Sequence, residues 1–256
     1  MVDDASTDGT ADIVRSLAKE IPNIHLITLQ KNVGAAEARN IGIRHAQSDL
    51  IAFLDSDDTW YPEKLGKQIN EFKCDASVVA VFSGSRVIYS DRSFSQIPSA
   101  DVTLTDLYCS NKLSTTSSAL ISKKALAEVG GFDPTLPSCQ DWDLFIRLAE
   151  IGKIRVVQED LVEFWNHDAE RISNNKQSIL SGHKIVRNRI YDRISDPTLL
   201  RKVRGSHECT LADIFSSLIF EPHRAIKHAI TGIALAPSVE SFRILARVIR
   251  RAAVHR

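Results

Sequence analysis

The sequence predicts an α/β fold in which helices flank a mainly parallel β-sheet, and two observations lead to this prediction. Residues 50–54 read Leu-Ile-Ala-Phe-Leu and are apolar at every position, which is typical of a parallel strand buried on both faces. Segments with helical and with strand-like apolar spacing alternate from residue 11 to residue 82. Such alternation is typical of strand–helix–strand units, whose strands lie parallel in one sheet.

The individual elements follow from the same spacing. Apolar residues recur at helical intervals where helices are expected, and short apolar runs mark the strands. Past Ser85 the alternation becomes less regular. The expected helices cover residues 11–21, 35–46, 62–72, 123–129 and 141–150, and the expected strands cover residues 25–29, 50–54, 78–82, 117–122, 154–157 and 161–165.

From Lys176 onward the sequence is helical, with Pro197, Pro222 and Pro237 interrupting it. We therefore expect an α/β domain over residues 1–175 and a helical C-terminal extension over residues 176–256. The length of 256 residues fits one large domain with such an appendage.

The composition excludes several classes of protein. The formal net charge is zero, which gives no reason to expect nucleic acid as a partner. The four cysteines lie far apart without a Cys-x-x-Cys pair, so we expect reduced thiols in a cytoplasmic protein. No run of 18 apolar residues occurs, and no membrane-spanning segment is expected.

An acidic cluster, Asp55-Ser56-Asp57-Asp58, directly follows the predicted buried strand. In open α/β sheets, ligands bind beyond the carboxyl ends of the strands. Three adjacent carboxylates repel one another, and either a solvated loop or a divalent cation relieves that repulsion. Mg²⁺ and Mn²⁺ favour one or two carboxylates together with substrate phosphate oxygens and water. The position after a buried strand favours the metal site over the solvated loop.

Two further acidic positions admit two interpretations each. Asp3-Asp4 lies in Val-Asp-Asp-Ala-Ser-Thr-Asp-Gly-Thr, which also reads as a polar loop ahead of a helix. Asp141, in Gln-Asp-Trp-Asp, also fits a helix N-terminus, where the dipole favours acidic side chains. Taken singly, neither position decides between a structural and a functional role.

Taken together, five blocks resemble the family 2 glycosyltransferases in their order and spacing. They are VDDASTDGT, KNVGAAEARNIGI, SDLIAFLDSDDTWYPEKL, SSALISKKALAEVGGFD and QDWDLFIRLAEIG, and the resemblance covers residues 2–167. It implies a GT-A fold, a Rossmann-like α/β domain with a nucleotide half and an acceptor half. It also implies inverting transfer of a sugar from a nucleotide-activated donor.

The resemblance implies roles in donor binding for several residues. Asp4, together with Asp3, would contact the base or ribose of the donor. Asp55 and Asp57 would form the Asp-x-Asp element that holds Mg²⁺ or Mn²⁺, with Asp57 in direct contact with the metal. Arg39 either approaches the nucleotide or occupies a solvated position; both interpretations stay open.

The resemblance also implies roles near the acceptor. Asp141 matches the general base that takes the proton of the acceptor hydroxyl. Gln140 stands where the family usually has Glu, which leaves the base itself intact. Asp58 would support the metal site, and His167 is a candidate third metal ligand, although a single histidine is more often a surface or packing residue.

The function that these features imply is metal-dependent, inverting transfer from a UDP-, GDP- or dTDP-sugar to a glycan or lipid-linked acceptor. The expected setting is synthesis of a surface polysaccharide or glycolipid. One alternative is an inactive truncated remnant with only a binding role. A nucleotidyltransferase is a further alternative, but the QDWDL block speaks against it, since that chemistry needs no base at this place.

The chain departs from the family pattern at its start. Members begin with a strand and a helix ahead of the Asp-Asp block, whereas Met1 here directly precedes Val2. The sequence is therefore expected to lack a central strand and to expose strand edges and apolar surface. Either Met1 is internal to a longer natural protein, which we favour, or the gene is truncated.

The last predicted helix is basic and amphipathic. Residues 242–256 contain five arginines and no acidic residue, interspersed with apolar residues. Such a helix lies on an anionic membrane surface or packs on the domain with a solvated basic face, and both interpretations stay open. The first would place the protein peripherally on the inner face of a membrane.

Overall fold

The computed structural model describes residues 1–113, 115–165 and 175–254. They form two units, which are described separately. The sheet unit comprises Met1–Asp101, Leu113–Leu136 and Asp143–His167, and the helical unit comprises Val102–Lys112, Pro137–Trp142 and Asp168–Arg256. No helix among the described residues is both long and apolar enough to cross a membrane.

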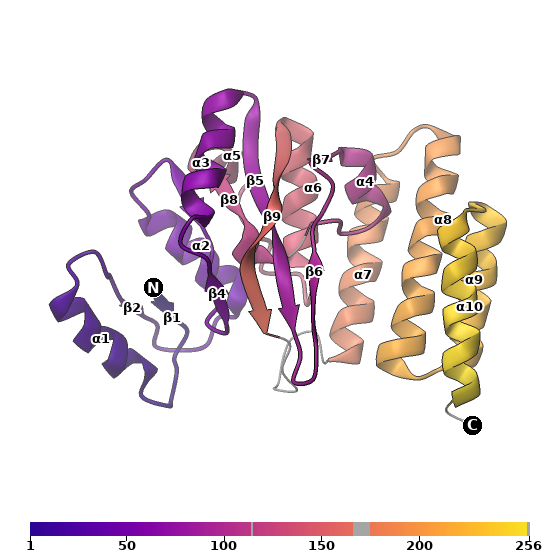
Figure 1. Cartoon of the computed structure of the whole chain (residues 1–256), viewed down its shortest axis with the longest axis horizontal. Helices are drawn as coiled ribbons and strands as arrows, with labels where there is room; N and C mark the ends of the chain where they lie inside the picture. Colours follow the sequence, from indigo (N-terminus) through magenta and orange to yellow (C-terminus); the bar gives the residue numbers. More distant parts are fainter. Residues whose placement is uncertain (114, 166–174, 255–256) are drawn as a thin grey trace. The chain divides into compact units, whose positions relative to one another are not determined.

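A seven-stranded sheet organises the sheet unit (Figure 1). Its main path runs β3 (Leu50–Ala52), β8 (Leu120–Ser122), β5 (Val78–Ile88), β9 (Lys153–Trp165) and β4 (Asp58–Trp60), with β6 (Ser93–Gln96) pairing with β5 and β7 (Asp101–Val102) with β9.

The α/β class with flanking helices is confirmed, but the sheet is mixed and not mainly parallel. β5 and β9 pair in parallel, whereas β8 runs antiparallel to β3 and β5, and β4 runs antiparallel to β9. Parallel neighbours need a long crossover, usually helical. After β5 the chain instead turns back within residues 89–92, so β6 pairs antiparallel with β5.

The two long strands differ from their predicted extents for local reasons. β5 continues past residue 82 because Ser83 and Ser85 are fully buried, and these small polar residues hide the strand from an apolar pattern. The predicted strands at 154–157 and 161–165 are one strand, β9, with irregular register opposite Gly84. A Cβ at Gly84 would lie 2.9 Å from the Glu159 carbonyl oxygen, so only glycine permits this approach.

The predicted strand at 117–122 is also divided. A 3₁₀ turn, Thr116–Ser118, precedes the shorter β8, and the hydroxyl of Ser118 donates to the Thr115 carbonyl at 2.7 Å. Side-chain hydrogen bonds of this kind compete with strand pairing. The helices of the sheet unit match their predictions within two residues: α2 (Ala35–His45), α3 (Lys64–Cys74), α5 (Lys123–Glu128) and α6 (Gln140–Ile151), of which α6 begins in the helical unit.

The first residues form a small sheet of their own. β1 (Val2–Asp3) pairs in parallel with β2 (Ile27–Thr28), beside α1 (Thr10–Glu20) (Figure 1). The helix predicted over residues 11–21 is present, but Ile13, at 63% exposure, Leu17 and Ile21 are exposed. A two-stranded sheet offers too little surface to bury the apolar stripe of an amphipathic helix.

A buried polar network lies between α3 and the sheet. The Lys64 amine is fully buried, donates to Gln68 Oε1 at 2.8 Å and lies 4.2 Å from the centre of the Trp60 ring. Gln68 Nε2 donates to the carbonyl oxygens of Val81 and Ser118, at 2.9 and 2.8 Å. Burial lowers the pKa of Lys64 from 10.5 to about 7, while the Trp60 ring favours the charged amine.

Lys64 is expected to make stability depend on pH. Between pH values near 7 and 10.5 the unfolded chain keeps a proton that the folded amine releases, so stability rises with pH in this window. Urea denaturation measures this effect. From about pH 7 to about pH 9, the free energy of unfolding of the wild type should rise by roughly 1–3 kcal/mol more than that of Lys64→Met. The exposed Lys67→Met is the matched control and should keep the wild-type slope. If the free energy of unfolding rises equally with pH in wild type and in Lys64→Met, Lys64 is not the source of the pH dependence.

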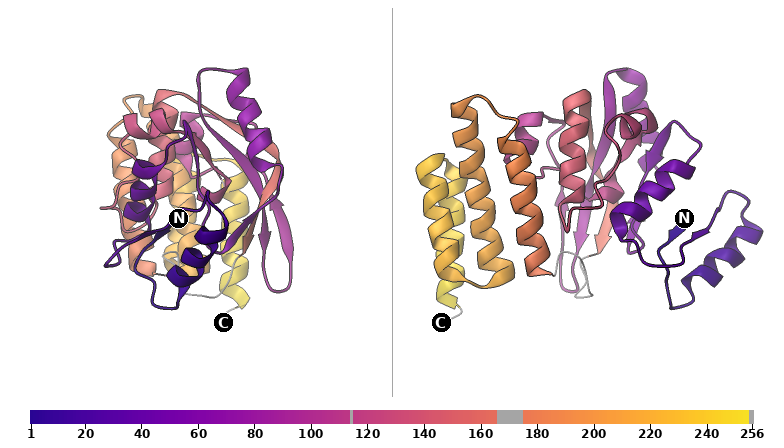
Figure 2. Two further views of the ribbon diagram at one scale, coloured as in Figure 1. Left: turned by 90° about the vertical axis from the view of Figure 1, so that its left-hand side faces the viewer. Right: turned by 180° about the vertical axis from the view of Figure 1, so that it is seen from behind.

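The helical unit is built from α4 (Leu104–Cys109), α7 (Lys176–Tyr191), α8 (Pro197–Ile214), a π-helical turn (Phe215–Ile219), α9 (Pro222–Leu235) and α10 (Val239–Val254). The predicted helical character from Lys176 is thus confirmed, and Pro197 and Pro222 begin helices. Figure 2 shows α7 to α10 side by side.

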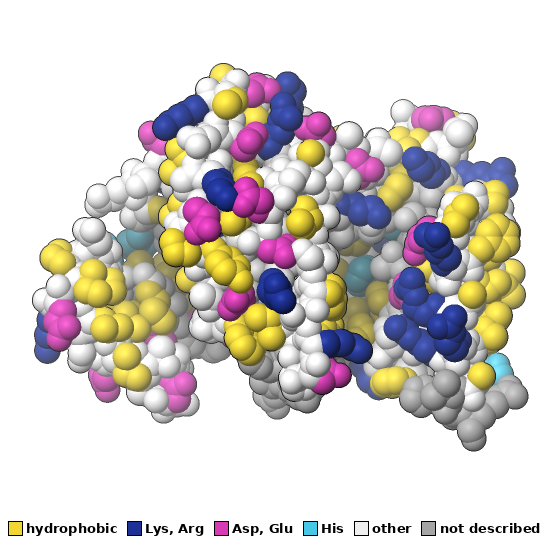
Figure 3. Space-filling model, in the orientation of Figure 1, with side chains coloured by type: hydrophobic (Ala, Val, Ile, Leu, Met, Phe, Trp, Pro, Cys, Tyr) yellow, Lys and Arg dark blue, Asp and Glu magenta, His cyan; other side chains and the backbone are white. Residues whose placement is uncertain are grey.

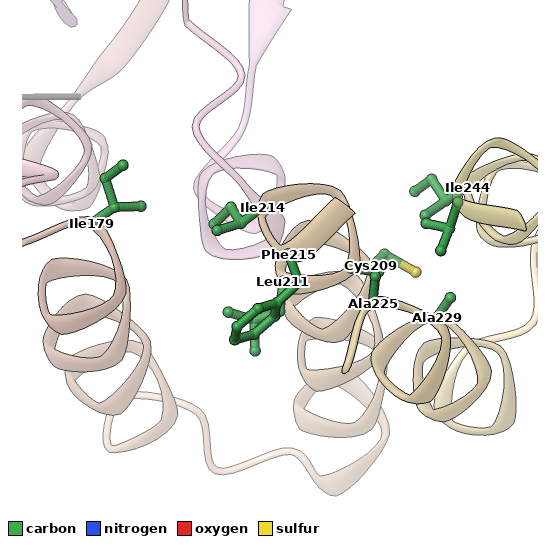
Figure 4. Packing of buried hydrophobic residues seen from close by; sticks show 10 residues of the cluster. Ile179, Cys209, Leu211, Ile214, Phe215, Ala225, Ala229 and Ile244 are labelled. Atoms are coloured by element: carbon green, nitrogen blue, oxygen red, sulfur yellow. The ribbon is translucent and has the colours of Figure 1, made fainter. Parts of the chain in front are cut away.

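Small residues allow the helices of this unit to approach closely. A Cβ at Gly205 of α8 would lie 2.6 Å from that of Ala236, and one at Gly232 of α9 would lie 2.7 Å from Cys209 Sγ. In Figure 4 the side chains of Cys209, Ala229 and Ile244, from three helices, point toward one another. All four cysteines are free thiols, as the sequence predicts.

Candidate active site

The loop that follows β1 is tied to the start of α2. Asp4 accepts two backbone hydrogen bonds, from Val33 N to Oδ1 at 2.7 Å and from Gly34 N to Oδ2 at 2.9 Å. Gly34 has a φ of 85°, which favours glycine. Both carboxylate oxygens of Asp4 therefore hold the turn ahead of α2, a structural use that the sequence did not indicate.

Replacing Asp4 with alanine is expected to destabilise the sheet unit. The change removes the acceptor of the Val33 N–H and leaves the Gly34 N–H with only its 3.1 Å bond to Asn32 Oδ1, which costs about 1–2 kcal/mol for partly buried groups. Calorimetry should show a melting temperature lower by roughly 2–8 °C. Asp4→Asn keeps one acceptor oxygen, and its melting temperature should fall by about half as much. A wild-type melting temperature for Asp4→Ala would show that the carboxylate does not hold this turn.

Asp3 is buried, with 2% of its surface exposed. Its Oδ1 accepts a long hydrogen bond from Ser6 N, at 3.4 Å. Its Oδ2 has no hydrogen-bond donor among the described residues. A buried carboxylate oxygen without a donor is costly, and the oxygen is suited to accept a hydrogen bond from a ligand.

Arg39 connects α2 to the second acidic loop. Its guanidinium donates to Asp55 Oδ1 at 2.5 Å and lies 5.5 Å from the centre of the Phe132 ring. The neighbouring Asn40 is buried and exchanges two hydrogen bonds with the Phe132 backbone, at 2.8 and 2.9 Å. Arg39 is therefore paired with a carboxylate and only 22% exposed, whereas the sequence left a solvated position open.

Ser117 fixes the loop that carries the Asp-x-Asp element. The Asp55 backbone N–H donates to Ser117 Oγ at 3.0 Å, and Trp60 Nε1 donates to the Ser117 carbonyl at 2.8 Å. Asp57 is exposed and Asp58 is buried. Ser117 lies in a recognised block, but nothing in the local sequence shows that it contacts a loop 62 residues earlier in the chain.

The donor atoms fit a metal that arrives with a phosphate ligand. In the described part of the chain, no three His, Cys, Asp or Glu side chains gather to form a metal site. Mg²⁺ commonly uses one or two carboxylates and takes its other ligands from phosphate and water. Asp57, exposed at the end of the loop, and Asp55 match that requirement. The third predicted ligand, His167, lies outside the described residues.

Asp141 lies in the first turn of α6, in the helical unit. Asn111 Nδ2 donates to Asp141 Oδ2 at 3.0 Å. The adjacent Trp142 is buried, and its Nε1 donates to the Leu107 carbonyl of α4 at 2.7 Å. These two bonds join the first turn of α6 to α4 and the residues that follow it, and they orient one oxygen of the Asp141 carboxylate.

A buried histidine secures α4 in turn. His207 Nε2 lies 2.7 Å from the Tyr108 carbonyl oxygen, and Nδ1 lies 2.9 Å from the Tyr191 hydroxyl. A carbonyl can only accept, so Nε2 carries the proton and Nδ1 accepts from Tyr191. Burial lowers the pKa of His207 to about 3, so the ring is neutral near neutral pH. The Trp142 and His207 rings pack edge to face, with centroids 5.7 Å apart.

The structure thus ties two residues predicted to bind the sugar donor to α2: Asp4 holds the turn ahead of this helix, and Asp55 pairs with Arg39 of the helix itself. Asp141 belongs to the helical unit and is held by Asn111. Asn111 could not be predicted from the sequence, because it stands 30 residues before Asp141 with no recognisable pattern around it.

Comparisons with known proteins bear on this site. The TuaG protein of Bacillus subtilis (strain 168), named a putative teichuronic acid biosynthesis glycosyltransferase, is 45% identical over 91 residues, or 36% of each chain. An uncharacterized glycosyltransferase of Nostoc sp. (strain PCC 7120) is 30% identical over 191 residues, or 71% of this chain and 58% of its own length. The chain thus spans between about a third and three fifths of these relatives.

The fold also resembles a solved structure. The crystal structure of residues 1–349 of TarS from S. aureus, in complex with UDP-GlcNAc, aligns with a TM-score of 0.66 at 18% identity, over 92% of this chain and 71% of that one. At that identity the likeness concerns the fold. The sequence profile of glycosyl transferase family 2 matches residues 1–130, which include both acidic loops and α2. This chain belongs to glycosyltransferase family 2.

Proposed function

We propose that the protein transfers a sugar from a nucleotide-sugar donor to an acceptor hydroxyl with inversion, using Mg²⁺ or Mn²⁺. The observation that carries the proposal is the meeting of two acidic loops at α2, one through Asp4 and the other through Arg39 and Asp55. Membership of glycosyltransferase family 2 supports it. TarS, whose structure holds UDP-GlcNAc, has a similar fold.

Asp3 is proposed to bind the donor's base. Its buried Oδ2 accepts no hydrogen bond from the described protein, so it fits a ligand N–H. Uracil, thymine and guanine each carry a ring N–H, whereas adenine and cytosine present an unprotonated ring nitrogen at the corresponding edge. UDP-, dTDP- and GDP-sugars are therefore the proposed donors.

Asp55 and Asp57 are proposed to hold the metal together with the diphosphate. When bound, the metal would neutralise the charge that develops on the leaving nucleotide. Arg39 holds Asp55 in place through their 2.5 Å contact, and its positive charge lies beside the same loop. Asp57 is the exposed member of the pair and the proposed direct ligand. His167 stays a candidate ligand from the sequence alone.

Asp141 is proposed to act as the general base. It would accept the proton of the acceptor hydroxyl as that oxygen attacks the anomeric carbon from the face opposite the leaving group. One displacement inverts the configuration. The hydrogen bond from Asn111 limits rotation of the carboxylate and so keeps it oriented.

A glycan or a lipid-linked glycan is the proposed acceptor, in the synthesis of a surface polysaccharide or glycolipid. The relative TuaG is named for teichuronic acid biosynthesis, and another relative is a chondroitin synthase of Pasteurella multocida (strain Pm70). We place the reaction in the cytoplasm, at the inner face of a membrane. The proposed catalytic domain covers residues 1–175, followed by the helical extension.

Donor hydrolysis tests the chemistry without knowledge of the acceptor. The protein would be incubated with UDP-, GDP- and dTDP-sugars and Mn²⁺, and the released sugar followed by proton NMR. An α-linked donor should first release the β-anomer, because water replaces the acceptor in the same displacement. Initial release of the α-anomer would contradict inversion. A folded protein that neither binds nor hydrolyses any of these donors would instead support the inactive remnant.

A further inference from the structure

Charge is divided unevenly along this neutral chain. Residues 175–256 contain 15 Lys and Arg but 6 Asp and Glu, whereas residues 1–174 contain 17 and 26. The net charge is therefore +9 in the C-terminal segment and −9 in the rest. A positive region of this size attracts an anionic surface, and such asymmetry within one chain indicates a polyanionic partner.

The last helix has more apolar surface than its packing uses. Ile244 and Val248 of α10 are buried in the core of the helical unit. On the opposite side, Phe242 is 55% exposed and Ile249 is 51% exposed, seven residues apart and so on one face of the helix. Ala246, also exposed, lies between them. A surface helix that packs along one side ordinarily shows one apolar stripe, whereas α10 has two.

The arginines of α10 fall into two groups. Arg247 and Arg251 point to α8, where both lie near Asp213, at 3.1 and 3.8 Å. Arg243 is 71% exposed and its nearest carboxylate, Glu240, is 3.7 Å away. Arg250 is exposed and forms no ion pair within the described residues. At 100° per residue, Arg243 and Arg250 fall on one side of α10, next to the exposed apolar stripe.

We call Val239, Phe242, Arg243, Ile249 and Arg250 the C-terminal face. Val239 is 70% exposed, and Ile230 of the adjacent α9 is 54% exposed. Figure 3 shows apolar side chains beside Lys and Arg side chains over α9 and α10. Large apolar side chains grouped on an exposed surface mark an interaction site.

We propose that the C-terminal face docks on the surface of an anionic lipid bilayer, with Phe242 and Ile249 among the acyl chains and Arg243 and Arg250 at the phosphates. A bilayer accommodates both kinds of side chain on this face. The apolar side chains can enter the acyl-chain region, while the arginines on the same helix reach the anionic headgroups. Nucleic acid would use the arginines but leave the apolar stripe in water. A second copy would cover the stripe but bring two segments of charge +9 together.

This inference rests on the proposed function only for its purpose, which is to hold the enzyme where lipid-linked acceptors lie. The docking itself needs no donor and no chemistry. A binding assay without nucleotide therefore fails or succeeds independently of sugar transfer.

Sedimentation with lipid vesicles tests the docking. The full chain would be mixed with vesicles of neutral phosphatidylcholine, or of phosphatidylcholine and phosphatidylglycerol, and the bound fraction measured. Binding should require phosphatidylglycerol and weaken with added salt. Arg243→Gln with Arg250→Gln should weaken binding roughly 25-fold, since each arginine near an anionic surface contributes about fivefold. Phe242→Ser with Ile249→Ser should weaken it at least as much, by removing buried apolar area.

A charge-matched control is available on α7 and α8. Lys184→Gln with Lys202→Gln removes the same charge from exposed positions outside the face and should change binding by less than about threefold. Equal losses in the control and the arginine variant would overturn the proposal, because net charge alone would then explain binding. Equal binding to both vesicle types would also overturn it. So would a dimer, measured by light scattering, that Phe242→Ser with Ile249→Ser abolishes.

Discussion

Replacing Asp141 with asparagine is expected to lower the turnover number of sugar transfer by about 10²–10⁴-fold, the usual contribution of a general base. An amide oxygen still accepts the 3.0 Å hydrogen bond from Asn111, so the side chain keeps its place while losing its ability to take a proton. The affinity for the nucleotide should stay within about twofold of wild type. Steady-state kinetics and calorimetric titration separate the two quantities.

Glu150→Gln provides the control for this substitution, since it removes a carboxylate from the exposed end of the same helix. Its turnover should equal that of wild type. Near-normal turnover of Asp141→Asn would remove Asp141 from the role of base. A loss confined to nucleotide affinity would assign the residue to donor binding instead.

Replacing Asp57 with alanine is expected to have the second large effect. In the presence of the nucleotide, the apparent affinity for Mn²⁺ should fall by at least about 100-fold, because few protein carboxylates supply ligands at such a site. Catalysis should fall with it. Isothermal titration of Mn²⁺ into the protein with saturating UDP measures the change.

The control for Asp57 is Asp91→Ala, which removes an exposed carboxylate from the turn between β5 and β6. It should leave the Mn²⁺ affinity unchanged. If Asp57→Ala also binds Mn²⁺ normally, the metal is held elsewhere or is not used. An equal Mn²⁺ affinity with and without UDP would contradict a metal that arrives with the diphosphate.

Much of the fold follows from local spacing, because helices satisfy their hydrogen bonds locally. The predicted segments 35–46, 123–129 and 141–150 are helices within a residue or two. Strand direction could not be predicted in the same way, since pairing joins distant segments. β5 is the example: Ser83 and Ser85 interrupt its apolar pattern, yet both are fully buried, in a strand that lies between β8 and β9.

The residues of the site also differ in how far the local sequence predicts them. Asp3, Asp4, Asp55, Asp57 and Asp141 were recognisable because each lies in a block of characteristic sequence. The residues that orient them are remote in sequence, as Ser117 is from Asp55 and Asn111 from Asp141. Burial could not be predicted at Lys64 either: a lysine in a helical pattern is expected at the surface, yet this one is fully buried. The boundary near residue 175 and the site roles themselves stay predictions.

Calorimetric titration of the purified 256-residue protein with UDP, GDP and dTDP, with and without Mn²⁺, tests the donor site most directly. The two acidic loops joined through α2 predict that at least one of these nucleotides binds, more tightly with Mn²⁺ than without it, and that Asp3→Ala weakens this binding. ADP and CDP serve as the mismatched bases. A folded protein, judged by circular dichroism, that binds none of the three nucleotides with or without metal would contradict the account.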